Sequence, residues 1–390
     1  MTADVVVVGA GPAGAATAAR LAAAGVDVLL LDRARFPRDK ACAEFLSPGA
    51  VAELSRAGVL EAAAAAGAWQ RGMRIVSGGS EFVLAYDGGR RGLGIARRTL
   101  DALLVDRAVA CGARVREGVA VTGAVACAGR VTGVRVRGED RSERTVEAGL
   151  VVGADGFRSP VARSLGLERP APRPRRLGLV AHVRGAACDG VGLMAVGAGG
   201  YCGVASVGGA KTSVGLAISP NYRRSGEPVS EFFDRSVAAL PPARGALAGA
   251  ERTTAIRGAT PLARRVARVA GPGYLLVGDA AGATDPFTGE GVLRALRGAE
   301  LAADAAGAAL LRPDRDPVGY AAARRAAFAA KDRACLVLQA LLATPALLEY
   351  CLRRAARRPC AARVLAGVFG DYVPAETFFC PRLFADLLRP

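Results

Sequence analysis

The sequence predicts a Rossmann-like α/β fold that carries an inserted antiparallel β-sheet and ends in a helical region. Three observations predict it. An apolar strand runs into closely spaced glycines at Val5–Gly14, and a similar pattern returns at Tyr274–Gly282. Between them, after Pro170, the hydrophobic period changes to two, which is typical of strands. From Asp316 to the end of the chain the pattern is helical.

The first sixty residues predict a dinucleotide site. The four valines Val5–Val8 indicate a parallel strand that is buried on both faces, because it has no polar face. Gly9 then permits a tight turn, Gly11 lets the backbone approach a pyrophosphate, and Gly14 lets helix and strand pack closely. The alanine-rich helix that follows would present free N–H groups to the phosphates. Asp32 ends the next apolar strand, where a carboxylate can bind ribose hydroxyls.

The formal net charge of +17 does not by itself indicate nucleic-acid binding. The lysines are Lys40, Lys211 and Lys331, so arginine supplies almost all of the 52 basic residues, and it is scattered along the chain. We therefore expect no nucleic-acid partner. The nine cysteines include no Cys-x-x-Cys pair, so we expect neither a metal site nor a disulfide framework.

The N-terminus has no basic leader, and its glycines belong to the phosphate loop, so we expect no signal peptide and a cytoplasmic protein. No apolar run indicates a transmembrane segment, because the uncharged stretch Gly190–Ala210 is rich in glycine and is typical of strands. The arginines within Arg353–Arg363 either touch anionic lipid or form a solvated helix face. Any membrane contact is therefore expected to be peripheral.

The elements between Asp32 and Pro170 follow from turn signals and periodicity. A helix should start near Ser47 or Pro48, because serine is a favourable cap and proline suits the first turn. The other expected elements are a hairpin at 71–86, a helix at 99–111 with a short strand after it, a meander at 119–125, 131–137 and 145–147, and a separate buried strand at 150–153 leading into a helix.

Four strands at 176–185, 191–197, 201–209 and 211–220 predict an antiparallel sheet with one packed face and one face open to a pocket. A helix at 229–240 should end at Pro241 and Pro242, because proline breaks helices. The strand, glycine loop and helix pattern of the N-terminus then returns at 274–311.

Three separated motifs give a family resemblance. They are GAGPAG at 9–14 with Asp32, GADG at Gly153–Gly156, and GDAAGATDPFTGEGV at Gly278–Val292. The sequence resembles the FAD-dependent oxidoreductases that include geranylgeranyl reductases and single-component aromatic hydroxylases. The resemblance implies a discontinuous FAD-binding domain of the glutathione-reductase type with an inserted substrate sheet. The implied limits are 1–70, 97–170 and 255–312 for the FAD-binding domain, 71–96 and 171–254 for the substrate-binding sheet domain, and 313–390 for the C-terminal helical region.

The resemblance also carries individual roles over to this chain. Non-covalent FAD is the implied cofactor, and Gly289, Glu290 and Gly291 would place backbone N–H groups at the pyrimidine edge of its isoalloxazine. Reduced flavin is negatively charged there, so such helix-end donors would favour reduction by about 0.3–1 kcal/mol, and up to ~2 kcal/mol where partly buried. The other implied FAD-binding residues are Gly9, Gly11, Pro12, Ala13 and Gly14 at the pyrophosphate, Asp32 and Arg33 at the adenosine ribose, Arg97 at the phosphates, Asp155 and Gly156 near the pyrophosphate, and Gly278, Asp279 and Pro286 in the third motif, with Asp279 at the ribityl hydroxyls or pyrophosphate.

His182 is the only histidine, so a Ser-His-Asp triad and a histidine-rich metal site are not expected. It lies on the first strand of the inserted sheet, where the family often has a histidine. Two interpretations stay open. His182 either donates a proton to, or holds, a substrate in the pocket, or it is a hydrogen-bonded histidine of the sheet.

Cys42 lies in DKACAEFLSP, which resembles the Lys-x-Cys-Gly-Glu segment of the reductase branch, with Ala43 at the usual glycine. Its thiol either tunes the flavin or contacts a substrate double bond, or it is a small core residue. Glu44 and Arg38 on the same loop are candidate polar pocket groups. Trp69 is the only tryptophan, so the paired-tryptophan motif of flavin halogenases is absent and halogenation is not expected.

The implied activity is redox chemistry on a lipophilic small molecule, isoprenoid or polyketide-like, held by the apolar strands of 177–218. Two reactions stay open: reduction of a carbon–carbon double bond, and NAD(P)H- and O2-dependent oxygen insertion in secondary metabolism. A non-catalytic flavoprotein that escorts prenylated substrates is a remote third. The sequence holds no second Gly-x-Gly-x-x-Gly domain, so either NAD(P)H binds transiently or a separate electron-donor protein supplies the electrons.

Overall fold

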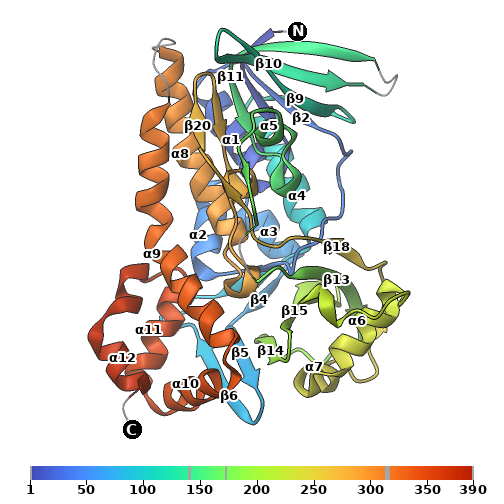
Figure 1. The fold of residues 1–390 in the computed structure, drawn as a ribbon, viewed down its shortest axis with the longest axis vertical. Helices are drawn as coiled ribbons and strands as arrows, with labels where there is room; N and C mark the ends of the chain where they lie inside the picture. The colour runs from blue at the N-terminus through green and yellow to red at the C-terminus, as the bar shows by residue number, and fades with distance from the viewer. Residues whose placement is uncertain (1, 139–141, 172–173, 312–316, 389–390) are drawn as a thin grey trace.

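The computed structural model describes residues 2–138, 142–171, 174–311 and 317–388. The chain is built on two large β-sheets, one above the other in Figure 1. The strands of the first sheet are β1 (Thr2–Val8), β2 (Val28–Asp32), β8 (Arg114–Glu117), β9 (Ala120–Cys127), β10 (Arg130–Arg137), β11 (Glu143–Gly153), β20 (Ala270–Gly271) and β21 (Tyr274–Leu276). Their order is β20-β21-β11-β1-β2-β8, and β10 and β9 pair onto β11 as a hairpin.

Strand β1 lies at the centre of the first sheet. Val7 pairs in parallel with Leu30 of β2 on one side and with Val152 of β11 on the other, and all three side chains are completely buried. A strand with parallel neighbours on both sides and apolar residues on both faces is the arrangement that the valine run predicted. That prediction is confirmed.

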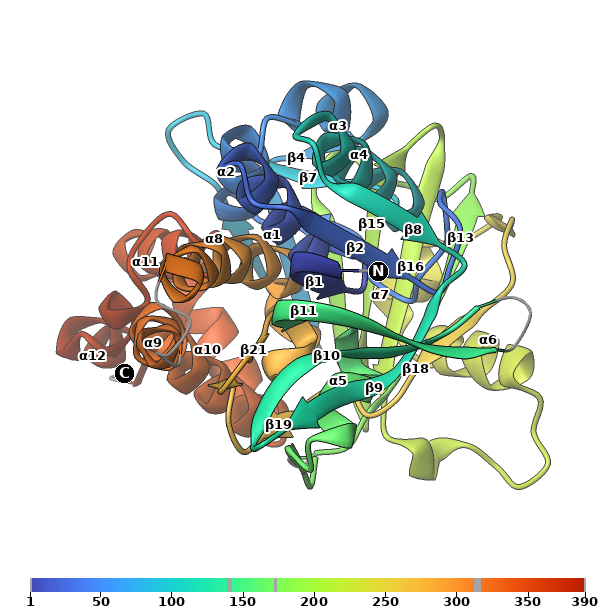
Figure 2. The same ribbon diagram turned by 90° about the horizontal axis from the view of Figure 1, so that it is seen from above.

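Alternate residues of β1 point into two different cores. Val5 and Val7 pack against the helices of one face, whereas Val6 and Val8 pack against the β9–β10 hairpin and a short helix on the other face. The helices of the first face are α1 (Pro12–Ala23), α4 (Arg97–Ala110) and α8 (Gly291–Leu311), and the short helix of the second face is α5 (Pro160–Ser164). Figure 2 shows the sheet edge-on between these two layers.

The second sheet contains the four strands that the period-two pattern predicted, and that prediction is confirmed. Its order is β17-β13-β16-β15-β14-β5-β6, with β18 paired to β13, and β5 joins β14 in parallel. The hairpin expected at 71–86 supplies two of its strands. The strands are β5 (Gly72–Ser77), β6 (Ser80–Ala85), β13 (Leu177–Arg184), β14 (Gly192–Gly197), β15 (Gly200–Gly208), β16 (Lys211–Ile218), β17 (Glu251–Arg252) and β18 (Arg257–Ala259).

The expectation that one face of the second sheet is open was wrong. Strand β16 is buried at every residue after Lys211. On one face Phe232 of helix α6 (Val229–Ala238) packs with Leu216, together with helix α7 (Pro241–Ala246). On the other face Leu342 and Leu348 of the C-terminal helices pack with Ala217. The C-terminal region therefore covers the face that was expected to be free.

Two element boundaries also differ from the prediction. The last strand of the meander and the buried strand at 150–153 are one strand, β11, because Gly149 continues the strand beside Asp4 of β1, where an added Cβ would lie 3.0 Å from the Asp4 carbonyl. Pro241 and Pro242 do not only stop helix α6, since they also begin α7, where proline is favourable in the first turn.

Shorter elements connect the two sheets. The hydroxyl of Ser47 accepts a hydrogen bond from the N–H of Ala50, so the predicted cap of the helix at 48 is confirmed. Helix α4 begins at Arg97, two residues before the predicted start. The connecting elements are the three-stranded sheet β3 (Phe45–Leu46), β7 (Gly92–Gly94) and β4 (Ala68–Gln70), the pair β12 (Glu168–Arg169) and β19 (Arg265–Val266), and helices α2 (Pro48–Arg56) and α3 (Leu60–Ala66).

The expected helical tail consists of α9 (Val318–Leu342), α10 (Pro345–Arg357), α11 (Pro359–Phe369) and α12 (Pro381–Leu388), with a short helix η5 (Ala375–Phe379). The boundary expected at 312 and 313, and Asp316, lie outside the described residues. Within those residues, no single helix has the length and apolarity to cross a membrane, although Gly319–Leu342 and Pro345–Arg357 pass that test together, with a bend of 115° between them.

Candidate functional site

The three glycine motifs meet at the carboxyl ends of β1, β11 and β21, which are adjacent strands of the first sheet. A Cβ added to Gly9 would lie 2.6 Å from the carbonyl oxygen of Ala154, in the second motif. A Cβ added to Gly278, in the third motif, would lie 2.8 Å from Cβ of Ala13. The fold thus brings the three motifs into direct contact at the edge of a parallel sheet, where such sheets bind ligands.

Three cationic side chains face the glycines of this edge. A Cβ placed on Gly11 would lie 3.8 Å from Nη2 of Arg38 and 3.9 Å from Nη2 of Arg97, and one on Gly156 would lie 3.4 Å from Nζ of Lys40. Gly11 is also the N-cap of α1, and no side chain caps that helix. Free helix N–H groups beneath converging cations fit the pyrophosphate of FAD.

A buried carboxylate positions two of these cations. Asp101, completely buried, accepts hydrogen bonds from Nε and Nη2 of Arg97 at 2.7 and 2.8 Å, and its Oδ2 lies 2.9 Å from Nη1 of Arg38. Burial opposes the charge of Arg97, but Asp101 and the thiol of Cys42 outweigh it and raise the pKa of Arg97 above its usual range. The guanidinium is therefore fixed in place and permanently charged.

Lys40 lies in a different electrostatic environment. Burial, followed by the nearby charge of Arg97, lowers the pKa of Lys40 below its ordinary value. Because an adjacent anion favours the charged form of an amine, a bound pyrophosphate would raise that pKa again. Lys40 thus matches an anionic ligand better than the protein alone.

The acidic residues of the three motifs hold the loops that carry them. Oδ2 of Asp32 accepts a hydrogen bond from the N–H of Ala10 at 2.8 Å, while Arg33 beside it is exposed. Oδ2 of Asp155 accepts from the N–H of Val161 at 3.2 Å, and its Oδ1 is buried without a hydrogen-bond partner among the described residues. Burial raises the pKa of Asp155. An unpaired buried oxygen at this edge is consistent with a ligand that donates to it.

The loop of the third motif ends in the short helix η4 (Pro286–Thr288), then Gly289 with φ +69°, and α8 starts at Gly291. A Cβ on Gly289 would lie 3.7 Å from the ring of Phe45. We call residues 289–291 the flavin loop, from the role that the family resemblance implies. The carboxylate of Glu290 points into the protein, where its Oε1 accepts a hydrogen bond from Thr284, so only the backbone of the loop is available to a ligand.

The two candidate catalytic residues are linked through Glu44. Nε2 of His182 lies 2.6 Å from Oε2 of Glu44, and Oε1 of Glu44 accepts from the N–H of Arg97 at 2.7 Å. The thiol of Cys42 accepts from the N–H of Glu44 at 3.4 Å and also bonds the guanidinium of Arg97. His182 and Cys42 therefore belong to one network that reaches the phosphate cradle.

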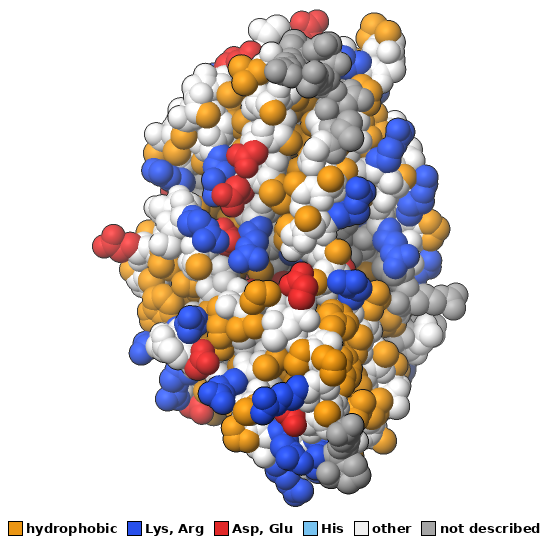
Figure 3. Space-filling model, turned by 90° about the vertical axis from the view of Figure 1, so that its left-hand side faces the viewer, with side chains coloured by type: hydrophobic (Ala, Val, Ile, Leu, Met, Phe, Trp, Pro, Cys, Tyr) orange, Lys and Arg blue, Asp and Glu red, His pale blue; other side chains and the backbone are white. Residues whose placement is uncertain are grey.

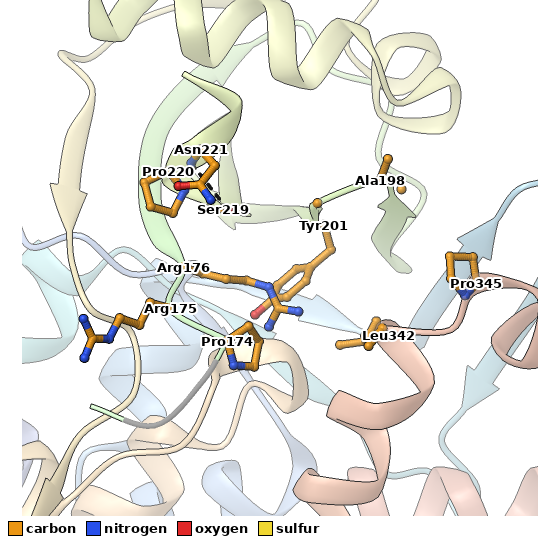
Figure 4. A pocket seen from close by; sticks show the side chains of 14 residues that line it. Pro174, Arg175, Arg176, Ala198, Tyr201, Ser219, Pro220, Asn221, Leu342 and Pro345 are labelled. Carbon is orange, nitrogen blue, oxygen red and sulfur yellow. Dashed lines mark hydrogen bonds between the residues drawn. The ribbon is translucent and has the colours of Figure 1, made fainter. Parts of the chain in front are cut away.

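A cavity of about 510 Å³ opens between the second sheet and the bend from α9 to α10. Figure 4 shows Tyr201 and Arg176 side by side at its centre, Leu342 beside them, and Arg175 extending away. The hydroxyl of Tyr201 donates to Asp285 at 2.6 Å, and Nη1 of Arg176 donates to the same carboxylate at 2.5 Å. The buried ion pair and the phenol thus form the floor of the cavity.

The floor of this cavity contacts the segment that leads into the flavin loop. The rings of Tyr201 and Phe287 pack edge to face with centroids 5.0 Å apart, and Asp285 also accepts from the N–H of Phe287. A ligand in the cavity would therefore be separated from the flavin loop by one layer of aromatic side chains. The cavity combines an apolar wall with a few polar groups, as is typical of small-molecule sites.

Several residues of this site were not predicted from the sequence. Lys40, Tyr201 and Arg176 carry no local motif, and each reaches the site only through contacts that are distant in sequence. Lysine is rare in this chain, and Lys40 lies two residues before Cys42 in a segment already considered, so that rarity was the available signal for it. Among the described residues, no group of histidine, cysteine and carboxylate side chains is arranged to hold a metal ion.

Comparison with known proteins gives a family match and reductase relatives. The family model described as "FAD binding domain" matches residues 2–308. Menaquinone reductase of Mycobacterium tuberculosis (strain H37Rv) is 32% identical over 368 residues, covering 84% of this chain and 83% of that protein. Digeranylgeranylglycerophospholipid reductase 1 of Methanopyrus kandleri is 34% identical over 323 residues, covering 80% of this chain and 82% of that protein.

Solved structures share the fold at lower identity. The flavin-dependent brominase Bmp2 superposes with a TM-score of 0.84 at 19% identity, covering 95% of this chain and 94% of that one. A geranylgeranyl bacteriochlorophyll reductase-like protein of Thermoplasma acidophilum gives 0.73 at 22% identity, covering 99% and 96%. The anhydrotetracycline hydroxylase OxyS of Streptomyces rimosus gives 0.73 at 24% identity, covering 95% and 76%. At these identities the similarity shows the fold alone.

Proposed function

The chain belongs to the FAD binding domain family of FAD-dependent oxidoreductases, and on this premise we propose that it reduces a carbon–carbon double bond of a lipophilic isoprenoid compound. The printed names of the relatives at 31–34% identity support reduction, since they are menaquinone reductases and digeranylgeranylglycerophospholipid reductases. A quinone or lipid that carries a polyprenyl chain is the proposed substrate class.

One structural observation carries the proposal most directly. The cavity of about 510 Å³ has apolar and polar walls, and its floor touches Phe287 at the start of the flavin loop through Tyr201. A polyprenyl chain would pack against Leu342 and the ring of Tyr201, while Asn221 and Arg176 at the cavity wall would accommodate a polar end. This arrangement matches an amphipathic substrate better than a small polar one.

The residues of this chain hold and orient the reactants. When bound, FAD supplies hydride transfer, which is the redox chemistry of flavins. The cradle of Arg38, Lys40 and Arg97 would bind its pyrophosphate, and the N-terminus of α8 would face its isoalloxazine. Reduction of a double bond also needs a proton at the second carbon, and we assign that proton to His182, whose Nε2 is oriented by Glu44.

NAD(P)H that binds transiently, or a separate electron-donor protein, would reduce the flavin in this proposal. The test is turnover of a menaquinone or a geranylgeranyl lipid by the FAD-loaded protein, with and without oxygen. We expect full anaerobic turnover and a product that has gained two hydrogen atoms. Turnover that requires oxygen, with a product that has gained an oxygen atom, would instead establish the hydroxylase alternative. A flavin that no donor reduces would favour the substrate escort.

A lipophilic substrate would reach the cavity from a membrane surface, and we include peripheral membrane contact in the proposal. Leu336 of α9 and Leu347 of α10 are 62% and 40% exposed on the two helices that bend at the cavity. Arg357 and Arg358, both exposed, end α10 and begin α11. Figure 3 shows hydrophobic side chains gathered on the lower part of this side, with lysine and arginine around them.

Flotation with lipid vesicles tests this contact. We expect the protein to bind vesicles that contain phosphatidylglycerol, to bind neutral vesicles weakly, and to lose binding as salt rises, because arginine attraction to anionic lipid is screened. The double variant R357E/R358E should bind weakly. The matched control is R135E, which changes an exposed arginine of β10 at the opposite end of the molecule. Cytoplasmic location stays part of the proposal and is tested by cell fractionation.

A further inference from the structure

A buried lysine joins the C-terminal region to the segment that carries the flavin loop. Lys331 of α9 is 7% exposed, and its Nζ donates to the carbonyl oxygen of Val368 and to Oδ1 of Asp371, both at 2.6 Å. The same Nζ lies 3.9 Å from Oε2 of Glu290 in the flavin loop. An ammonium group is buried at such cost only where it is paired and hydrogen-bonded, so these contacts define where α9 and α11 lie relative to the loop.

Glu290 binds the loop to its surroundings from the other side. Its Oε1 accepts from the hydroxyl of Thr284 at 3.1 Å and from the thiol of Cys335 at 3.2 Å, and it lies 3.0 Å from Nε of Arg294. Thr284 and Glu290 bracket η4, so this carboxylate closes the segment onto itself. Cys335 and Lys331 both come from α9. The conformation of the flavin loop is thus set partly by the C-terminal region.

Asp371 extends the same connection to the loop that holds Cys42 and Phe45. Asp371 has φ +61°, and the carbonyl oxygen of the preceding Gly370 accepts from the N–H of Gly49 at 2.9 Å. A Cβ on Gly49 would lie 2.5 Å from Cβ of Asp371, so only glycine fits there. The turn at 370–373 therefore packs on the N-terminus of α2, which directly follows β3.

The charge of Lys331 is needed by both carboxylates. Oε2 of Glu290 and Oδ2 of Asp371 are buried and have no hydrogen-bond partner among the described residues. Both residues line a cavity of about 470 Å³, together with Lys331, Arg294 and Arg297. Without the ammonium group, Asp371 would lose its charged partner and the negative charge of Glu290 beside the flavin loop would be less well neutralised.

We propose that Lys331 is a positioning residue of the flavin site, which couples docking of the C-terminal region to FAD binding. The inference rests on the proposed role of residues 289–291 at the flavin. Coupling of this kind is reciprocal, so a docked tail favours FAD binding and bound FAD favours a docked tail. The ammonium group also offsets the charge of Glu290, which favours the reduced, negatively charged flavin.

The test compares Lys331→Met with Lys331→Arg in the full-length protein. We expect K331M to bind FAD roughly tenfold more weakly, measured by fluorescence titration of the apoprotein, and its flavin midpoint potential to be more negative. K331R should restore most of both values, because it keeps the charge. The control is Arg325→Met, which removes an exposed charge from the same helix. Unchanged affinity and potential in K331M would overturn the inference.

Two further measurements cover a variant that does not fold. The double variant K331M/D371N removes the ammonium group and one carboxylate together, and it should fold while still binding FAD weakly. In the unmodified protein, FAD should slow proteolytic cleavage within 359–388, and equal cleavage rates with and without FAD would reject the coupling. If the unmodified protein bound no FAD at all, the proposed function would fail instead, so the two failures are distinguishable.

Discussion

Oε2 of Glu44 lies 2.6 Å from Nε2 of His182, so one carboxylate joins the loop after β2 to the first long strand of the second sheet. Its other oxygen accepts from the N–H of Arg97 at the start of α4. Glu44 is 4% exposed and has φ +62°, a left-handed conformation that costs energy for a residue other than glycine. A strained residue with two buried hydrogen bonds indicates that this junction is part of the site.

We therefore expect Glu44→Ala to weaken FAD binding more than His182→Ala. E44A leaves the N–H of Arg97 and the imidazole without a partner, which should lower the free energy of unfolding by about 1–3 kcal/mol and loosen the start of α4. H182A leaves the bond from Glu44 to Arg97 intact. Denaturant unfolding and FAD titration measure the two effects. Equal FAD affinity in both variants would count against a role of Glu44 in the cradle.

Gly14→Ala should abolish FAD binding, because the added methyl group would lie 1.8 Å from the carbonyl oxygen of Gly9. The helix and the phosphate loop would have to separate, and the cradle would lose its geometry. Gly307→Ala is the matched control, since α8 has open space there, and it should be neutral or stabilising by up to about 1 kcal/mol. Flavin absorbance of the purified proteins gives the result, and a yellow G14A protein would contradict it.

Elements that depend on neighbouring residues were predictable from the sequence. The valines of β1, the glycines after them and the cap at Ser47 each act within a few residues, so the local pattern contained the information. Strand β11 was divided wrongly because Gly149 resembles a break, whereas it allows close approach to β1. The coverage of the second sheet by Leu342 was not predictable, because an amphipathic helix shows that it has an apolar face but not what that face covers.

The same distinction applies to the candidate site. The glycine motifs lie in contact as the family resemblance implied, because each follows a strand of one parallel sheet. The floor of the cavity was missed, since Asp285 is 84 residues from Tyr201 and 109 residues from Arg176 in sequence. The cationic cradle was predicted only in part, because Lys40 lies in a loop without periodicity. Contacts of this range follow from the fold and not from local pattern.

Asp155→Asn should stabilise the protein without FAD at neutral pH. Burial raises the pKa of Asp155 above its ordinary value of 3.8, so ionisation of this carboxyl opposes folding at high pH. The penalty is complete above the raised pKa, decreases as pH falls through it, and vanishes below the ordinary value. Asparagine keeps an acceptor for the N–H of Val161, so D155N should gain about 1 kcal/mol at pH 7.

The pH dependence of this difference is the critical measurement. Thermal unfolding of both proteins from pH 7 downward should show the advantage of D155N shrinking as the pH falls. An advantage that is constant with pH would show that ionisation of Asp155 is not its cause. D155N should also bind FAD more weakly, if the unpaired oxygen of Asp155 accepts from the cofactor.

Cys202 and Cys335 should resist alkylation in the folded protein. Burial raises the pKa of both thiols to about 12, with a further contribution from Glu290 at Cys335. At pH 8 each would then hold roughly a thousandfold less thiolate than an ordinary cysteine, and the thiolate is the reactive form. The exposed Cys127 and Cys360 serve as internal controls. Peptide mass analysis after iodoacetamide treatment should find the buried pair unlabelled, and fast labelling of Cys335 would contradict its burial.

Leu342→Trp should block a polyprenyl substrate while leaving FAD in place. Leu342 ends α9 and lines the cavity of about 510 Å³, so an indole there would occupy the space proposed for the isoprenoid chain. We expect kcat/KM to fall by at least roughly tenfold, the size of a lost hydrophobic contact of 1–3 kcal/mol. Leu336→Trp is the control, because that side chain is 62% exposed on the same helix. Overpacking can cost stability, so flavin content and Tm are measured for both variants. Equal turnover by folded, FAD-loaded L342W and L336W would show that the substrate reaches the flavin by another route.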